Sequence, residues 1–255
     1  MKKKSGTPAS RVGSRNVASR IIAIRDQWHT KNHPFFKLFG QGKLPLRAMG
    51  LYMGQHYKFV TLVLPSFGYL FTRAPGDVRS AIIENLAEEA GLAAIQREGH
   101  KPHDHMLDIF AFTRAAGLKD SEVKALEPTA AWWGRTLHYV RTMQDEPVGV
   151  VLAMQSTQED QQVALNKEVT LPAFAKHYGY PRGSRAIAFF EEHAEADDEH
   201  STRQINLAAK YLDTPALQAR ACQVAEEACK LRWASISDIY RSEVLKEKPI
   251  LPRGV

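Results

Sequence analysis

The chain carries a histidine–aspartate–histidine triplet in the segment HAEADDEH, at His193, Asp197 and His200. In a helix these three side chains fall within about 60° of one another, on one face. The same face begins with the apolar residues Ala186 and Phe189, so we expect it to be buried. Buried imidazole and carboxylate groups need a partner, and a shared metal ion is one such partner. Such ligand sets are typical of non-haem iron, although an exposed helix rich in Glu and His would show the same triplet.

Three further ionisable residues share a predicted helix face with apolar side chains: Glu89, His105 and Glu159. They would add two carboxylates and an imidazole to the triplet, each from a different helix. Taken singly, each of these residues is more often a surface acid or a core histidine than a metal ligand. His100 and His103 lie nearer a predicted loop and are alternatives to His105. Four acids close to the triplet are expected to face solvent: Glu191, Glu192, Glu195 and Glu199.

Residues for a substrate site are harder to separate from ordinary core. Six aromatic or imidazole side chains of one long predicted helix could line a substrate pocket: Tyr52, His56, Tyr57, Phe59, Phe67 and Tyr69. A place in the core is the simpler interpretation for all of them except Tyr57. Lys167 and Arg135 could bind a substrate carboxylate, but a solvated surface position is the simpler interpretation of each.

Helical periodicity dominates the elements that must position these residues. Helices are predicted over about eight segments separated by Pro and Gly: 16–31, 46–73, 76–97, 103–116, 129–143, 148–167, 184–212 and 214–245. No segment is a convincing strand. The connections are too short to separate two domains. We therefore predict a disordered basic tail over residues 1–15 and one all-α domain over residues 16–255.

Composition narrows the function classes. The 255 residues are 44% hydrophobic, and the formal charge of +6 comes from six cations near the N-terminus, without which 28 of each sign remain. No basic face for nucleic acid is expected. No apolar run reaches the ~20 residues that cross a bilayer, so we expect no membrane partner. Cys222 and Cys229 are too far apart in one helix to pair, which favours a reducing, cytoplasmic location.

The order Glu…His…Glu…His-x3-Asp-x2-His on an all-helical chain of this length resembles the haem-oxygenase-like diiron oxidases and oxygenases. The resemblance covers nearly the whole body, from residues 20–45 through 84–91 to 231–240, and HAEADDEH is its most specific part. Members include UndA-type fatty-acid decarboxylases and CADD-type 4-aminobenzoate-forming proteins. The resemblance implies a single-domain haem-oxygenase-like bundle of about seven to eight helices.

Carried over position by position, the resemblance implies six metal ligands: Glu89, His105, Glu159, His193, Asp197 and His200. Three carboxylates and three neutral imidazoles suit two Fe(II) ions. The implied activity is an O2-using oxidation of a small carboxylate- or amine-bearing metabolite, by desaturation, C–C cleavage or N-oxygenation. The resemblance also allows a homodimer and an external electron donor. The gap between Glu89 and His105 is longer than is usual in the family.

The same fold hosts two other activities, those of the cofactorless PqqC-like oxidases and the TenA-type hydrolases. In PqqC-like chains the position matching His193 is not a ligand. TenA-type hydrolysis uses a cysteine from the middle of the chain, whereas no cysteine precedes Cys222 here. The residues therefore favour the metal enzyme, and a binding protein without redox turnover is the remaining alternative.

Overall fold

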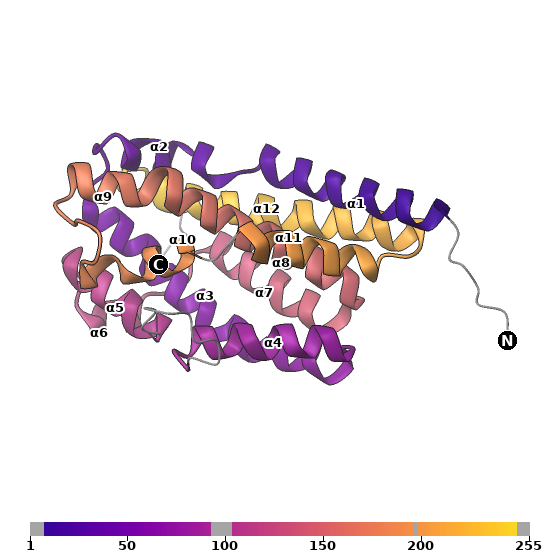
Figure 1. Ribbon diagram of the computed structural model, residues 1–255. Coiled ribbons are helices and arrows are strands. Elements are labelled where there is room, and N and C mark those ends of the chain that lie inside the picture. Colours follow the sequence, from indigo (N-terminus) through magenta and orange to yellow (C-terminus); the bar gives the residue numbers. More distant parts are fainter. Residues whose placement is uncertain (1–7, 93–103, 196–197, 249–255) are drawn as a thin grey trace, which may run out of the picture.

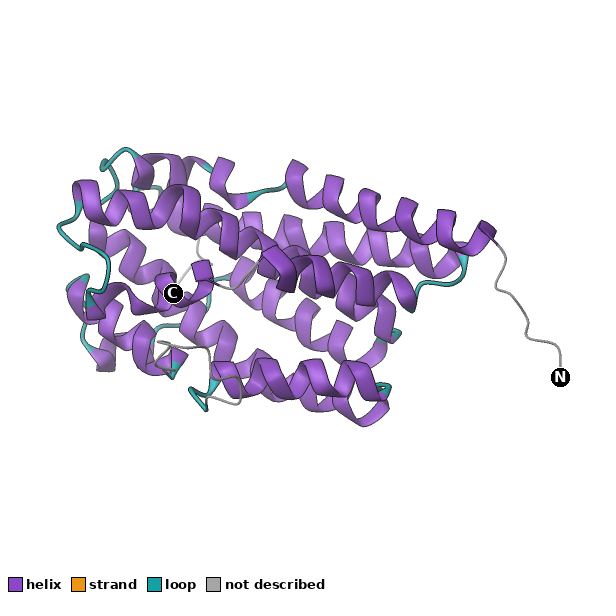
Figure 2. Cartoon of the chain, in the orientation of Figure 1, coloured by secondary structure: helices purple, strands orange, loops and turns teal. Residues whose placement is uncertain are grey.

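The computed structural model describes three stretches of the chain: 8–92, 104–195 and 198–248. It gives the backbone without side chains at 8–16, 195 and 198–203. All regular structure in the described residues is helical, which confirms the predicted all-α class (Figure 1, Figure 2).

The helices follow one another in this order: α1 (Pro8–Gln27), η1 (Thr30–Asn32), α2 (Pro34–Gly40), α3 (Leu46–Arg73), α4 (Gly76–Glu89), α5 (His105–Ala115), α6 (Asp120–Ala125), α7 (Ala130–Asp145), α8 (Val148–Leu165), the π-helical η2 (Asn166–Thr170), α9 (Leu171–His177), η3 (Arg185–Ile187), α10 (Ala188–Glu195), α11 (Asp198–Lys210) and α12 (Pro215–Glu243).

The helix α8 lies at the centre of the bundle. Its residues 150–154 are all buried, because α11 and α12 pack against it and α7 also contacts it. Figure 1 shows α8 between α11 and α7. A helix that is apolar all round belongs in such a position. Further along α8, Glu159 is half-buried and lines a cavity between the helices.

Gly149 allows the end of α11 to approach the start of α8 closely. A Cβ atom at this position would lie 2.6 Å from the backbone oxygen of Tyr211, which is closer than real Cβ atoms come. Any side chain here would push the two helices apart. The glycine thus sets the distance between the helix that carries Glu159 and the chain that follows His193.

Two predicted boundaries illustrate what periodicity can and cannot locate. The helix predicted over 46–73 is confirmed at both ends, between Pro45 and Ala74. The predicted start of the first helix at residue 16 is wrong, because α1 begins at Pro8. Proline is favoured in the first turn of a helix, so residues 8–15 continue the helix outward rather than belonging to a tail. Of the predicted tail, only 1–7 lie outside the described residues.

The helix predicted over 184–212 starts with the 3-10 turn η3 and continues as α10 and α11, on either side of residues 196–197, which lie outside the described residues. The helix predicted over 148–167 changes to a π-helix after Leu165. The helices α2, α6 and α9 have six or seven residues each and are not predicted, because two turns show too little periodicity.

Two expectations on environment can be compared with the described residues. No helix among them combines the length and the apolarity that a membrane span requires. Cys222 and Cys229 are both buried free thiols, as predicted from their spacing.

Candidate metal centre

Two helix ends meet at His105. Glu89 is the last residue of α4, and His105 is the first residue of α5, directly after the N-cap Asp104. The Asp104 carboxylate accepts hydrogen bonds from the backbone N–H groups of Met106 and Leu107 at 2.8 and 3.2 Å, which fixes where α5 begins. The His105 Nδ1 atom consequently lies 2.9 Å from the Glu89 Oε2 atom.

A second carboxylate holds the other side of the same ring. The His105 Nε2 atom lies 2.9 Å from Glu192 Oε2, which belongs to α10, and both side chains are mostly buried. Burial alone would lower the pKa of His105, but hydrogen bonds to Glu192 and Glu89 and their charges raise it to about 10. Burial would raise the pKa of Glu89, yet the hydrogen bond with His105 holds it below its ordinary value.

His193 presents one ring nitrogen to this pair. Its Nδ1 atom donates a hydrogen bond to the Phe189 carbonyl oxygen at 2.8 Å, one helical turn earlier, so Nε2 carries the free lone pair. The centroids of the His105 and His193 rings lie 4.6 Å apart. Burial and the positive charge of His105 lower the pKa of His193 to about 4, so its ring is neutral at physiological pH. A neutral imidazole whose second nitrogen is held by a carbonyl is prepared to bind a metal ion.

These contacts bring three predicted ligands together. One ligand atom each from Glu89, His105 and His193 lies within 4.8 Å of the others. One metal ion can touch atoms at such spacing, because metal–nitrogen and metal–oxygen bonds of about 2 Å place ligands on opposite sides some 4 Å apart. The donor set, a carboxylate and two imidazoles, suits iron.

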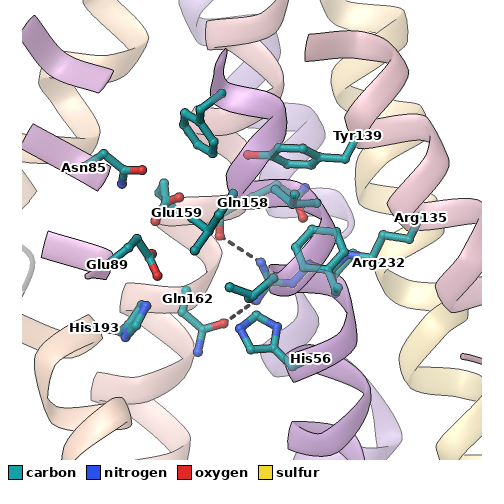
Figure 3. Close-up of a pocket in the computed structure, with 15 residues that line it drawn as sticks. His56, Asn85, Glu89, Arg135, Tyr139, Gln158, Glu159, Gln162, His193 and Arg232 are labelled. Atoms are coloured by element: carbon teal, nitrogen blue, oxygen red, sulfur yellow. Dashed lines mark hydrogen bonds between the residues drawn. The ribbon is translucent and has the colours of Figure 1, made fainter. Parts of the chain in front are cut away.

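A cavity of about 80 Å³ adjoins this cluster and extends between α3, α4, α7, α8, α10 and α12. Space of that size holds about five water molecules or a small organic group. One wall is apolar and consists of Phe59, Val60, Val63, Leu64 and Phe67. Figure 3 shows Glu89 and His193 on one side of the cavity and Arg135 and Arg232 on the other.

Glu159 lines the same cavity as Glu89 and His193. Burial and the negative charge of Glu89 raise its pKa to about 7. An acid with this pKa is half protonated at neutral pH, and a nearby cation would be needed to keep it ionised. The predicted ligand Glu159 thus faces the site from α8.

The remaining predicted ligands fall where the structure gives no side chains. Asp197, His100 and His103 lie outside the described residues. His200 belongs to the first turn of α11, of which only the backbone is described. The positions of these four side chains relative to Glu89 stay predictions.

The substrate residues are distributed differently from the expectation. His56, Phe59 and Phe67 line the cavity, whereas the described lining includes neither Tyr57 nor Lys167. The Tyr57 ring packs against Phe110, with ring centroids 4.8 Å apart, and Lys167 is exposed in the π-helix.

Arg135 is buried, so the predicted solvated surface position is wrong for this residue. It is 5% exposed and lines the cavity, because it follows Trp132 by three positions and precedes Tyr139 by four on the buried face of α7. Burial and the neighbouring charge of Arg232 lower its pKa to about 9, so it remains a cation at neutral pH. The apolar residues at these spacings were the signal for its burial.

Sequence reasoning also misplaced Glu192, which was expected to face solvent. Its side chain is mostly buried against His105. Glu192 lies about 100° around the helix from His193 and so from the face that carries the triplet. Periodicity therefore predicts that Glu192 faces outward. A signal was present, since Ala188 and Phe189 precede it by four and three positions and define a second apolar face.

A family model described as an iron-containing redox enzyme matches residues 51–233, well over half of the chain. The chain belongs to this family. This iron-containing redox enzyme is 25% identical over 237 residues to a 4-aminobenzoate synthase of Nitrosomonas europaea. The aligned region covers 88% of the chain and 90% of the relative. A 4-aminobenzoate synthase of Chlamydia muridarum is 22% identical over 192 residues, covering 75% and 77%.

Solved structures share the haem-oxygenase-like fold of this iron-containing redox enzyme. A Shewanella denitrificans domain of unknown function with a heme oxygenase-like fold superimposes with a TM-score of 0.70 at 16% identity, covering 95% of the chain and 96% of that structure. A TenA homolog from Pseudomonas syringae pv. tomato gives 0.72 at 12% identity, covering 88% and 93%. A CADD-like protein of unknown function from Nostoc punctiforme gives 0.58 at 13% identity, covering 92% and 99%. The family and the donor set agree, and the protein is an iron-dependent oxidoreductase.

Proposed function

We propose that this enzyme is a diiron oxidase or oxygenase that uses O2 to oxidise a small metabolite bearing a carboxylate or an amine. The observation that carries the proposal is the convergence of Glu89, His105 and His193 at the edge of a buried cavity that Glu159 also lines. Two carboxylates and two imidazoles beside one cavity are more ionisable groups than a single structural ion pair would need. The second ion would use Glu159 together with Asp197 and His200 from the HAEADDEH segment.

Each of the described residues has a definite task in this proposal. The hydrogen bond from His193 Nδ1 to the Phe189 carbonyl keeps Nε2 aimed at the site. Glu89 and Glu192 hold the His105 ring between them until a metal ion displaces its proton. The apolar wall of α3 offers water no hydrogen-bond partner along that side of the cavity. Iron, when bound, supplies the redox chemistry with O2, and the protein supplies placement and a dry environment.

The names of the relatives give a product of this chemical class, which supports a related small molecule as the ligand of this cavity. 4-Aminobenzoate, the compound in their names, carries one carboxylate and one amine on a small ring. A cavity with an apolar wall and charged ends suits a molecule of that general type.

The test is anaerobic loading with Fe(II), followed by exposure to O2 and a search for a transient visible absorption band. We expect two iron ions per chain and a band that is lost in His193→Ala. The matched control is Cys222→Ala, a buried change on α12 that should leave the band intact. Loading with one ion or none, or O2 consumption that survives chelation, would refute the diiron oxidase.

A further inference from the structure

Arg135 is a buried cation whose charge no described carboxylate neutralises. Its Nε and Nη1 atoms are buried and have no hydrogen-bond partner among the described residues. Its guanidinium carbon lies 4.1 Å from the Phe59 ring centroid and 5.0 Å from that of Trp132. The aromatic rings attract the positive charge, but they do not replace the hydrogen-bond acceptors that the N–H groups of the guanidinium need. A buried guanidinium with unused donors lacks an anion.

The neighbouring Arg232 adds a second positive charge beside Arg135. Its Nη1 atom donates to the Gln158 carbonyl oxygen at 2.9 Å, and Nη2 donates to Gln162 Oε1 at 2.7 Å. These partners satisfy hydrogen bonds but carry no charge. Its Nε atom is also buried, and no described residue forms a hydrogen bond with it. One side of the cavity therefore holds two cations.

The acids on the other side are already engaged. Glu89 holds His105, and Glu159 lies on the same side of the cavity, where burial and the charge of Glu89 raise its pKa more than the charge of Arg232 lowers it. Iron bound there would take up their negative charge, so they cannot also neutralise the arginines. Figure 3 shows the two groups on opposite sides, with the Arg135 and Arg232 side chains coming from the α7 and α12 side.

We propose that Arg135, supported by Arg232, binds the carboxylate of a monocarboxylate substrate with an apolar body and so directs its other end toward Glu89 and His193. This inference rests on the proposed function for the reaction, but it is a statement about binding and can be tested without turnover. A carboxylate matches the donors of a guanidinium. The apolar body would lie along the α3 wall, which includes Val63 and Phe67.

The experiment measures binding by calorimetry to the full chain, both metal-free and loaded with Mn(II), in the absence of O2. The probes are benzoate and hexanoate, their neutral counterparts benzamide and hexanamide, and inorganic phosphate. We expect the wild type to bind the carboxylates at least tenfold more tightly than the amides and phosphate. Equal binding of acid and amide, or tighter binding of phosphate, would overturn the proposal.

The variant Arg135→Gln should weaken carboxylate binding about 10- to 100-fold and leave amide binding unchanged, because it removes charged hydrogen bonds. The matched control is Arg141→Gln, an exposed arginine of the same helix that pairs with Asp145. It should bind all probes as the wild type does. Unchanged carboxylate binding in Arg135→Gln would refute the proposal.

A purely structural role for Arg135 predicts a different result for stability. Removal of an unneutralised buried cation should leave the melting temperature of the ligand-free protein unchanged or raise it, whereas loss of a structural contact lowers it. Should Arg135→Gln not fold, the structural role is shown and the proposal fails. Carboxylate binding that depends on Arg135 in a protein that takes up no iron would support this inference while refuting the diiron oxidase, so the two failures are distinguishable.

Discussion

Two pairs of buried histidines lie in different regions of the molecule and have opposite partners. At the junction of α1 and α2, His29 and His33 are 5% and 2% exposed. Their Nδ1 atoms accept hydrogen bonds from the backbone N–H groups of Lys31 and Phe35, at 3.2 and 3.1 Å. At the cavity, His105 lies between two carboxylates and His193 keeps a free Nε2 atom. His105 is 8% exposed and His193 is half-buried, so the main difference between the two regions lies in the partners.

This difference shows that the partners of a buried histidine, more than its burial, indicate its role. Burial lowers the pKa of His29 and of His33 to about 4, so both are neutral caps whose lone pairs the backbone uses. The lone pair of His193 is used by no described backbone group. The first pair stabilises a chain junction, whereas the second offers the lone pair of His193 and a His105 ring that must first lose a proton.

The largest expected effect comes from removing a ligand at the cavity. Glu89→Gln should lower the affinity for Fe(II) or Mn(II) by more than about 100-fold, since changes to the partners of metal ligands already cost 10- to 100-fold. Competition with a chelator of known affinity measures this loss. The matched change in the other region is His33→Asn, which should keep wild-type metal affinity. Equal losses in the two variants would erase the distinction between the regions.

The junction histidines should instead control stability in acid. Their folded pKa values of about 4 lie below the unfolded value near 6.5, so the unfolded chain binds more protons between these limits. Their stabilisation is complete above pH 6.5 and is lost as the pH falls toward 4. Each should cost roughly 2 kcal/mol of unfolding free energy between pH 7 and pH 5.

Urea unfolding at the two pH values measures this loss. His33→Asn keeps a side-chain acceptor for the cap but cannot be protonated, so its stability should depend less on pH than that of the wild type. The control is His177→Asn at an exposed position, with wild-type pH dependence expected. A His33→Asn curve parallel to the wild type would show that the junction does not titrate as described.

The same contrast explains how much could be predicted from the sequence. Long helices such as α3 were located because periodicity and proline marked both ends. Glu89 and His193, which the structure brings close to His105, could be predicted as candidate ligands because each lies on an apolar face. The contact of His105 with Glu192 could not be predicted, because it joins a helix start to a short helix that periodicity had merged into a longer one. The spacing of Arg135 from Trp132 and Tyr139 indicates a buried position on α7, whereas the charge of its side chain favours an exposed one.

Metal affinity at the cavity should rise with pH. In the metal-free protein His105 is raised to a pKa of about 10 by its two carboxylates, so it is protonated at neutral pH and must lose that proton to bind a metal ion. We expect the apparent Mn(II) affinity to increase about tenfold per pH unit between pH 7 and pH 8. Below pH 7 the slope should steepen, because Glu159 also becomes protonated. Calorimetry in two buffers of different ionisation enthalpy counts the protons released, and a pH-independent affinity would contradict this account.

The smallest effect should follow Glu192→Gln. This variant distinguishes the role of Glu192 from that of Glu89, the other carboxylate that contacts His105. If Glu192 only holds the protonated ring, its removal brings the pKa of His105 down toward 6.5 and weakens the competition between proton and metal. Metal affinity at pH 7 should then change by less than about tenfold, and its pH dependence should become shallower. A loss as large as that of Glu89→Gln would make Glu192 a ligand in its own right. The cavity would then hold His105 between two metal-binding carboxylates, and its contrast with the backbone-held His29 and His33 would become sharper.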